Sequence, residues 1–233
     1  MRSREGHVTA IVPAGGTGKR MGNSFPKQYL SIQKKPILIY TLEKLDRCKA
    51  IDETILAVPA PLIDQTELLI QDWQIRKVSR VIGSGGARQQ SVSNALNAAD
   101  PSCSLIVIHD AVRPFVSVAK IEEIILVASE EGAAILGIPE KSTVKRVIDR
   151  TVSETVDRTD LWQIQTPQVF YAELIREAYR LAETDGITGT DDAMLIERLG
   201  YPVFVVEGEE TNIKITSPID LHIAEVILQM EQT

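Results

Sequence analysis

Short runs of apolar residues alternate along the chain with longer segments whose apolar residues recur at helical spacing. The short runs, rich in β-branched residues, predict buried strands over 8–12, 54–58, 80–82, 105–108 and 134–138. The longer segments predict helices over 37–45, 62–75, 91–99 and 121–128. Continuous apolar strands between helices are typical of a parallel sheet that helices cover on both faces. We therefore predict an α/β fold with a doubly wound, mostly parallel, Rossmann-like sheet.

The alternation of strands and helices stops between residues 143 and 157. Residues 143–147 and 152–156 each alternate apolar and polar side chains, and the polar turn 148–151 separates them. This pattern predicts a hairpin with one apolar and one polar face, a protruding β-arm of about residues 141–158. Because an isolated hairpin is only marginally stable, we expect the arm to pack on another surface, of which a second subunit is one example.

The remainder of the chain returns to short elements. It predicts helices over 172–182, 192–199 and 219–230 and strands over 203–206 and 213–216. Since no repeat, low-complexity run or linker divides the sequence, residues 1–233 are expected to form a single domain that carries the arm.

Composition narrows the classes of partner. The chain has 233 residues, with 25 Lys and Arg against 32 Asp and Glu, a formal net charge of −7. This acidic balance argues against nucleic-acid or anionic-membrane binding. Two distant cysteines, Cys48 and Cys103, cannot supply a structural zinc site. With no signal-peptide pattern and no apolar run of about 20 residues, we expect a cytoplasmic protein without a membrane span.

A glycine-rich loop follows the first predicted strand. Residues 13–22 read Pro-Ala-Gly-Gly-Thr-Gly-Lys-Arg-Met-Gly, and Pro26-Lys27 follows. Such a loop at the end of a strand lets backbone N–H groups approach phosphate oxygens. A dinucleotide fingerprint fails because Met21 holds the third glycine position, and a P-loop fails because Arg20 replaces Ser or Thr. What remains resembles the nucleotidyltransferase signature G-G-x-G-x-R followed by P-K.

Two further loops follow predicted strands. Residues 83–91 contain three glycines and open a helix, so they face either a nucleoside or simply solvent. His109 and then Asp110 follow the predicted strand 105–108. An acidic residue at the carboxyl end of a strand is well placed to bind a metal ion. His109 itself is expected to be packed, and Arg113 is available to pair with a phosphate.

Three later motifs each have a structural alternative. Trp162 is expected in the core or an interface rather than as a stacking platform. Thr190 and Asp191 precede a helix and are therefore candidate caps. Lys214, within a predicted strand, is either a solvated lysine or a ligand of an anion.

Taken in order, these motifs resemble the 2-C-methyl-D-erythritol 4-phosphate cytidylyltransferases, the CTP-using enzymes of the non-mevalonate isoprenoid pathway. The resemblance covers nearly the whole chain and rests on residues 13–20, 26–30, 85–91, 109–114, 157–158, 161–162, 166–168, 190–191 and 212–214. It implies a homodimer in which the β-arm embraces the partner. That arrangement suits the orphan hairpin.

The resemblance also implies roles for individual residues. Those expected around the CTP triphosphate and base are Ala14, Gly15, Gly16, Gly18, Arg20 and Lys27, with Arg20 and Lys27 catalytic. Those expected to hold the cytidine are Gly85, Arg88 and Ser91, and Asp110 would bind Mg²⁺. The methylerythritol phosphate pocket would contain Asp110, Arg113, Thr166, Thr190 and Lys214, with Thr143 and Arg158 from the arm.

This chain departs from the family pattern in two places. Gly86 and Ala87 stand where many relatives carry acids, so any side-chain contact made there is lost. The approach to the arm, Glu140-Lys141-Ser142, also differs, which leaves the setting of Thr143 open.

The implied reaction is attack of the substrate phosphate on the α-phosphorus of CTP. A phosphate monoester has a second pKa of about 6, so it is largely ionised near neutrality and requires no general base. The nearest rival is a D-ribitol-5-phosphate cytidylyltransferase, disfavoured by the Arg158-x-x-Leu161-Trp162 arrangement. A nucleotide-binding oxidoreductase lacks its third glycine here, and a non-catalytic nucleotide sensor is disfavoured because Lys27 and Asp110 are both present.

Overall fold

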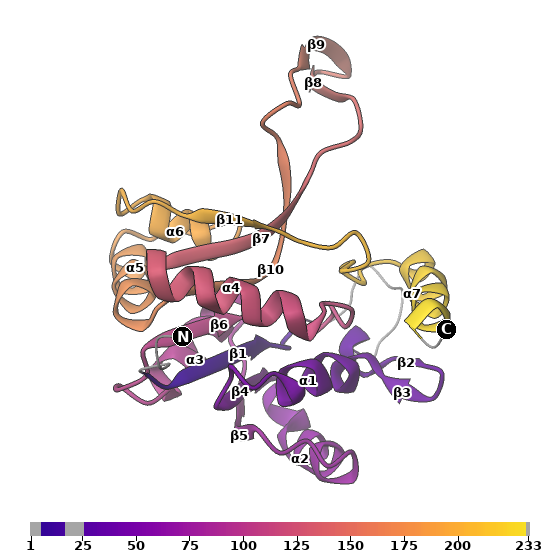
Figure 1. Ribbon diagram of the computed structural model, residues 1–233, viewed down its shortest axis with the longest axis vertical. Coiled ribbons are helices and arrows are strands. Elements are labelled where there is room, and N and C mark those ends of the chain that lie inside the picture. The colour runs from indigo at the N-terminus through magenta and orange to yellow at the C-terminus, as the bar shows by residue number, and fades with distance from the viewer. Residues whose placement is uncertain (1–5, 17–25, 232–233) are drawn as a thin grey trace.

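Within residues 6–16 and 26–231, which the computed structural model describes, seven strands form one mixed sheet in the order β11-β7-β10-β6-β1-β4-β5 (Figure 1). These strands are β1 (Val8–Pro13), β4 (Glu53–Val58), β5 (Val78–Gly83), β6 (Leu105–Ile108), β7 (Ala133–Pro139), β10 (Trp162–Tyr171) and β11 (Phe204–Glu207). Short two-residue strands, β2 (Ser31–Ile32) and β3 (Lys35–Pro36), pair separately. The predicted α/β fold with a mostly parallel sheet is confirmed.

Helices cover both faces of this sheet. They are α1 (Ile37–Arg47), α2 (Ile63–Asp72), α3 (Arg88–Ala98), α4 (Val118–Glu131), α5 (Ala172–Thr184), α6 (Ala193–Glu197) and α7 (Pro218–Glu231), with single 3-10 turns at Lys27–Tyr29 and Ala60–Leu62. Ile11 belongs to the apolar cluster that contains residues of α3 and α5, whereas its neighbours Ala10 and Val12 belong to the cluster that contains residues of α1 and α4. Burial on both faces explains why β1 is apolar throughout.

One strand of the sheet runs against the others. β10 lies between β6 and β7 and is antiparallel to both. The sequence did not predict it, because Gln163, Gln165 and Gln168 break the apolar run. The pairing with β7 is also irregular between Ile164 and Gln168. That interrupted segment carries Thr166, which the site uses.

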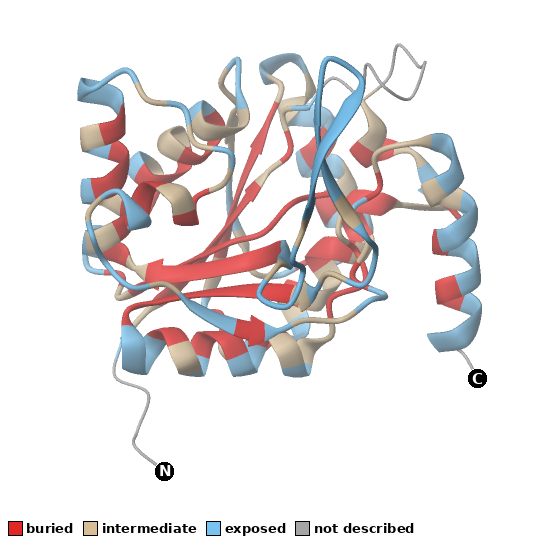
Figure 2. Ribbon diagram, turned by 90° about the horizontal axis from the view of Figure 1, so that it is seen from above, coloured by how far each residue is buried: buried red, intermediate tan, exposed pale blue. Residues whose placement is uncertain are grey.

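The predicted β-arm is a hairpin of β8 (Val144–Ile148) and β9 (Thr151–Val156). Asp149 and Arg150 form its turn, and both have positive φ, as two-residue hairpin turns require. The hairpin projects from the body of the molecule (Figure 1) and is exposed along most of its length (Figure 2). Its role in dimerisation stays a prediction.

One predicted strand is replaced by a loop, and several elements begin or end at other residues than predicted. Residues 213–216 form no strand: the Ile215 N–H donates to the Val112 carbonyl at 2.9 Å, so this segment docks on a loop instead of a sheet edge. Helix α3 begins at Arg88, three residues before the predicted start, because the glycine loop ends at Ala87. No described helix is long and apolar enough to cross a membrane.

Candidate active site

The candidate site is a cavity of about 650 Å³ at the carboxyl ends of the parallel strands. Its walls come from the loops after β1, β5 and β6 and from two other segments: Pro13, Ala14, Gly15, Gly16, Lys27, Gln28, Gly85, Gly86, Ala87, Arg88, Ser91, Asp110, Ala111, Val112, Lys214 and Thr216. The chain places β4 and β5 on one side of β1 and then crosses to β6 on the other. Such a change of direction opens a crevice where open α/β sheets bind ligands.

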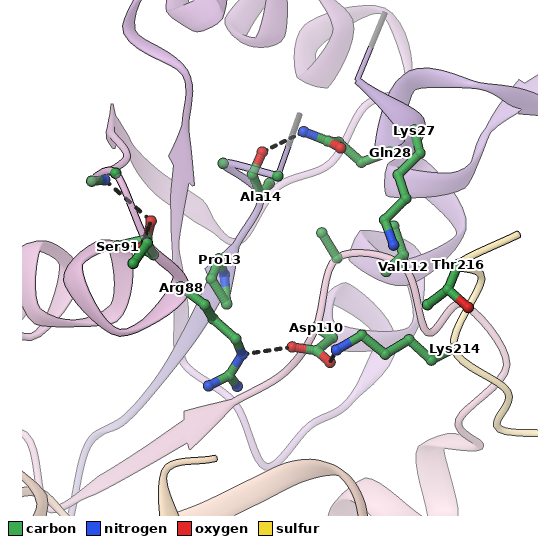
Figure 3. Close-up of a pocket in the computed structure, with 16 residues that line it drawn as sticks. Pro13, Ala14, Lys27, Gln28, Arg88, Ser91, Asp110, Val112, Lys214 and Thr216 are labelled. Carbon is green, nitrogen blue, oxygen red and sulfur yellow. Dashed lines mark hydrogen bonds and ion pairs between the residues drawn. The ribbon is translucent and has the colours of Figure 1, made fainter. Parts of the chain in front are cut away.

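The first wall is the loop that follows β1. The Ala14 N–H donates to the Ala57 carbonyl at 2.7 Å and extends the strand pairing to the cavity edge. A Cβ on Gly15 would lie 2.5 Å from the Cβ of Ser84, so glycine is needed where two loops touch. The Gln28 side-chain amide donates to the Ala14 carbonyl (Figure 3). Of the predicted residues here, Gly18 and Arg20 lie outside the described residues.

The second wall is the loop that leads into α3. Gly85 donates its N–H to the Ser91 hydroxyl oxygen at 3.1 Å, and this hydroxyl donates to the Ala87 carbonyl at 2.9 Å. The start of α3 therefore opens on the cavity, where unpaired helical N–H groups favour an anion. Gly86 and Ala87 are exposed, and a Cβ on Gly86 would meet no atom within 4 Å. The departure from the family pattern at Gly86 and Ala87 thus leaves this part of the wall open.

A buried carboxylate and several cations form the floor of the cavity (Figure 3). Asp110 is 6% exposed; its Oδ1 lies 3.0 Å from Nε of Arg88, and its Oδ2 lies 2.7 Å from Nζ of Lys214. Burial by itself would raise the pKa of Asp110, but Arg88 and Lys214 outweigh it and hold that pKa well below its usual range. Lys27 points in from the facing wall and donates to the Ile215 carbonyl at 2.9 Å. Three cations and one carboxylate thus line the cavity, and this excess of positive charge favours an anionic ligand.

A second row of side chains supports Asp110 from behind. The Thr166 hydroxyl accepts the Asp110 N–H at 3.0 Å and lies 3.1 Å from Nδ1 of His109. His109 is fully buried, as expected of a packed histidine, and burial lowers its pKa to about 4, so it is neutral at pH 7. Nε of Arg113 lies 3.9 Å from Asp110, and its Nη1 donates to the Asn212 carbonyl at 2.7 Å. Thr166 and Arg113 thus adjoin the site without lining the cavity.

Three predicted substrate residues lie elsewhere in this chain. Thr143 and Arg158 are exposed at the foot of the arm, where Arg158 donates to the Lys141 carbonyl. Thr190 is exposed, and its hydroxyl lies 3.8 Å from the sulfur of Met194. Its neighbour Asp191 accepts the Met194 N–H at 3.0 Å, which agrees with the expected capping role. None of the three predicted residues lines the cavity.

Sequence reasoning missed several residues of the site. Gln28 and Thr216 line the cavity, and their only signal was a place within the quoted motifs. Asp192 was missed entirely: it is 1% exposed, and its Oδ2 lies 2.7 Å from Nη2 of Arg88. Because it follows two residues that resemble helix caps, no local pattern indicated a buried ion pair.

The sheet, the two glycine loops and the cation-rich cavity define an α/β enzyme of the nucleotidyltransferase class. A sequence model of the 2-C-methyl-D-erythritol 4-phosphate cytidylyltransferase family matches residues 8–230. The chain belongs to this family, and it is a cytidylyltransferase.

Similar proteins agree over almost the full length. The chain is 45% identical over 227 residues to the 2-C-methyl-D-erythritol 4-phosphate cytidylyltransferase of Syntrophus aciditrophicus, covering 97% of each chain. It is 45% identical over 229 residues to that of Dictyoglomus thermophilum, covering 97% of this chain and 98% of the other. The crystal structure of 4-diphosphocytidyl-2C-methyl-D-erythritol synthase from Anaerococcus prevotii superposes with a TM-score of 0.85 at 31% identity, covering 96% of each chain.

Proposed function

We propose that this cavity transfers the cytidylyl group of CTP to 2-C-methyl-D-erythritol 4-phosphate, giving 4-diphosphocytidyl-2-C-methyl-D-erythritol and pyrophosphate. The observation that carries the assignment is the convergence of Lys27, Arg88 and Lys214 on one cavity edged by two glycine loops. An acidic protein needs such a local excess of cations to bring two phosphate-bearing reactants together.

The transfer is a single displacement at phosphorus. A phosphate oxygen of the methylerythritol substrate attacks the α-phosphorus of CTP, and a new P–O bond forms. The bond from the α-phosphorus to the oxygen that bridges to the β-phosphate breaks, and pyrophosphate leaves with the electron pair. With a second pKa of about 6, the attacking phosphate is already mostly ionised near pH 7. Positioning and charge neutralisation therefore account for the catalysis.

Different residues of the cavity would bind CTP and the acceptor phosphate. Ala14, Gly15 and Gly16 would approach the triphosphate, with Lys27 beside them to neutralise charge that grows on the α-phosphoryl group and the leaving pyrophosphate. Gly85, Arg88 and Ser91 would hold the cytidine. Lys214 would meet the phosphate of the acceptor, with Arg113 and Thr166 supporting the floor. The expectation for Arg20 and Gly18 rests on the sequence motif alone.

Mg²⁺ fits the chemistry of this donor set. Among the described residues that line the cavity, Asp110 is the only carboxylate. No group of three His, Cys, Asp or Glu side chains within the described part could hold a metal ion alone. Mg²⁺ is commonly held by one or two carboxylates together with substrate phosphates, and Asp110 would hold it in this way. When bound, Mg²⁺ would screen the repulsion between the two anionic reactants.

The arm would complete the site of a second copy of this chain. Val147, Ile148 and Val152 are exposed on the hairpin, and apolar side chains in this setting favour burial against a partner. Thr143 and Arg158 lie at the foot of the same hairpin, away from the cavity of their own chain. A homodimer in which each arm reaches the partner's cavity would give both residues a substrate contact.

Pyrophosphate release tests the proposal. With CTP and Mg²⁺, the enzyme should release pyrophosphate with 2-C-methyl-D-erythritol 4-phosphate and far less with D-ribitol 5-phosphate or other polyol phosphates. Lys214→Ala should abolish most of the release, whereas Lys120→Ala, a lysine outside the cavity that pairs with Glu123, should not. Release that depends on CTP but not on any polyol phosphate would overturn the proposal.

A further inference from the structure

A buried carboxylate lies directly behind the cavity wall. Asp192 is 1% exposed and precedes α6. Its Oδ2 lies 2.7 Å from Nη2 of Arg88, and its Oδ1 accepts the Tyr179 hydroxyl proton at 2.5 Å. Both oxygens thus have a partner inside the protein. Asp192 is not among the described residues that line the cavity, so a bound ligand would not displace these partners.

The backbone of Asp192 is tied to the central sheet. Oε1 of Gln168, on β10, accepts the N–H groups of Asp192 and Ala193, each at 3.1 Å. Nε2 of the same glutamine donates to Asp191 at 2.8 Å. Gln168 is itself 1% exposed. These bonds fix the Asp192 carboxylate relative to β10, which also carries Thr166 beneath Asp110.

Arg88 therefore connects two different carboxylates. Asp110 lines the cavity and lies at 3.0 Å from Nε, whereas Asp192 lies behind the wall. Burial lowers the pKa of the Arg88 guanidinium, but Asp192 and then Asp110 outweigh it and raise that pKa above its ordinary value. Of these two partners, Asp110 lies in the cavity, so a phosphate or a metal-bound ligand can replace it at Arg88. Asp192 lies behind the wall and keeps its ion pair with Arg88.

We propose that Asp192 is a positioning residue that holds the Arg88 guanidinium at the cavity wall while Arg88 exchanges Asp110 for CTP. The proposal rests on the proposed contact between Arg88 and the nucleotide. Without the Asp192 charge, Asp110 becomes the sole carboxylate partner of Arg88 described in the structure, so Arg88 is drawn toward the floor of the cavity and CTP must compete with that ion pair. Loss of Asp192 should therefore weaken CTP binding more than it slows the chemical step.

The test measures the Kd of CTP by titration calorimetry and the kcat and KM of the full-length enzyme for four single variants and one double variant. Asp192→Asn removes the charge and keeps the size. Tyr179→Phe removes the other partner of Asp192 and leaves its ion pair with Arg88 intact, so it controls for damage to the buried cluster. Asp192→Glu keeps the charge and covers the case in which Asp192→Asn does not fold. Arg88→Ala is combined with Asp192→Asn in a double-mutant cycle.

Asp192→Asn should raise the Kd and KM for CTP about tenfold, the scale of one charge-assisted hydrogen bond, and lower kcat by less than about threefold. Asp192→Glu should restore part of the affinity, and Tyr179→Phe should leave the Kd within about threefold of the native value. In the Arg88→Ala background, Asp192→Asn should add almost nothing.

Two results would overturn the positioning role. The first is an equal loss of CTP affinity in Asp192→Asn and Tyr179→Phe. The second is native CTP affinity in Asp192→Asn while Arg88→Ala binds CTP poorly. A different result, native CTP affinity in Arg88→Ala itself, would contradict the proposed nucleotide contact of Arg88. The two proposals can therefore fail separately.

Discussion

At the scale of single residues, the cavity is organised around Asp110, which lies 3.0 Å from Nε of Arg88 and 2.7 Å from Nζ of Lys214. Asp110, Lys27 and Lys214 stand in short motifs whose residue types already indicate phosphate chemistry. Asp192 and Asn212 are almost fully buried, yet their residue types do not indicate this burial, because their partners lie about a hundred and about fifty residues away along the chain. Substitutions at this scale should change either the charge at the reacting atoms or the hydrogen bonds that hold the charged side chains in place.

Lys27→Ala should lower kcat far more than it raises the KM for CTP. The Lys27 amino group lies at the cavity wall beside the first glycine loop, where charge grows during the reaction. Removing one such interaction typically costs about 10²–10³ in rate. Steady-state kinetics at saturating Mg²⁺ measure both parameters. A variant within about threefold of the native kcat would rule out this role.

Asn212→Ala should destabilise the fold and weaken binding of the acceptor phosphate. The fully buried Asn212 amide donates to Gln165 at 3.1 Å and to the Thr166 carbonyl at 3.0 Å, and it lies two residues before Lys214. Loss of these bonds should cost about 1–3 kcal/mol in the free energy of unfolding. Urea denaturation measures the loss, and the KM for methylerythritol phosphate should rise. Thr211→Ala, exposed and adjacent, is the matched control.

Whole elements were predicted best where a face is buried continuously. The apolar runs of β1, β4 and β6 were predicted correctly for this reason, whereas the exposed arm was predicted from its alternation and its polar turn. The strand β10 was not, because its glutamines serve the site and the irregular pairing, so they break the pattern that a strand normally shows. The prediction of a strand over 213–216 was wrong for the opposite reason. Apolar and polar residues alternate there as in a strand, but the segment is a loop that docks on the Val112 carbonyl. Elements that build the site deviate from the simple periodicities.

Arg158 should act on the cavity of the partner subunit. Chains with Arg158→Ala and chains with Lys27→Ala should each be inactive alone. In a mixed dimer, the cavity with an intact Lys27 would receive an intact arm, so mixing should restore part of the activity. Mixing Arg158→Ala with the double variant Lys27→Ala/Arg158→Ala is the control and should restore none. Absence of recovery in mixtures shown to contain heterodimer would count against the exchange.

Arg176 on α5 should stabilise α3, the helix whose start opens on the cavity. Its Nη1 donates to the Leu96 carbonyl at 2.6 Å, and its Nη2 donates to that of Asp100 at 3.1 Å, near the end of α3. Arg176→Ala should lower the free energy of unfolding by about 2–4 kcal/mol. Arg180→Ala, on the exposed side of α5, should change it little, because exposed ion pairs contribute little. Equal losses in the two variants, by urea denaturation, would contradict this clamp.

For the molecule as a whole, composition and patterning were sufficient to predict the architecture. The cavity of about 650 Å³ at the edge of the sheet agrees with the change of direction beside β1. We expect the choice of reactants to depend instead on backbone carbonyls at the cavity and on Arg158, Leu161 and Trp162, which no periodic pattern in the sequence marks as binding residues. Substrate choice is therefore the property of the complete molecule that most needs measurement.

The enzyme should prefer methylerythritol phosphate to ribitol phosphate and CTP to UTP. The first preference rests on Arg158, Leu161 and Trp162. The second rests on backbone acceptors near Ala14 and Gly85, with Ser91, which would accept from the cytosine amine. A carbonyl left facing the uracil oxygen would cost about 1–3 kcal/mol, or roughly 5- to 150-fold. Ratios of kcat/KM at fixed Mg²⁺ check both preferences. Equal kcat/KM values for CTP and UTP would show that the backbone acceptors do not distinguish cytosine from uracil.

The cavity joins segments that are very far apart along the chain, which has a consequence for biosynthesis. Lys27 donates to the backbone carbonyl of Ile215, 188 positions away, and Arg88 donates to the carboxylate of Asp192, 104 positions away. Contacts of such long sequence separation form late in folding, and a chain emerging from the ribosome cannot make them before its last segments appear. A nascent chain would thus lack the Ile215 carbonyl that holds Lys27, and the acceptor-binding Lys214, until residues 212–216 have left the exit tunnel. Nucleotide in the cell would then stabilise only finished molecules, by binding the folded state, and could not guide the earlier steps.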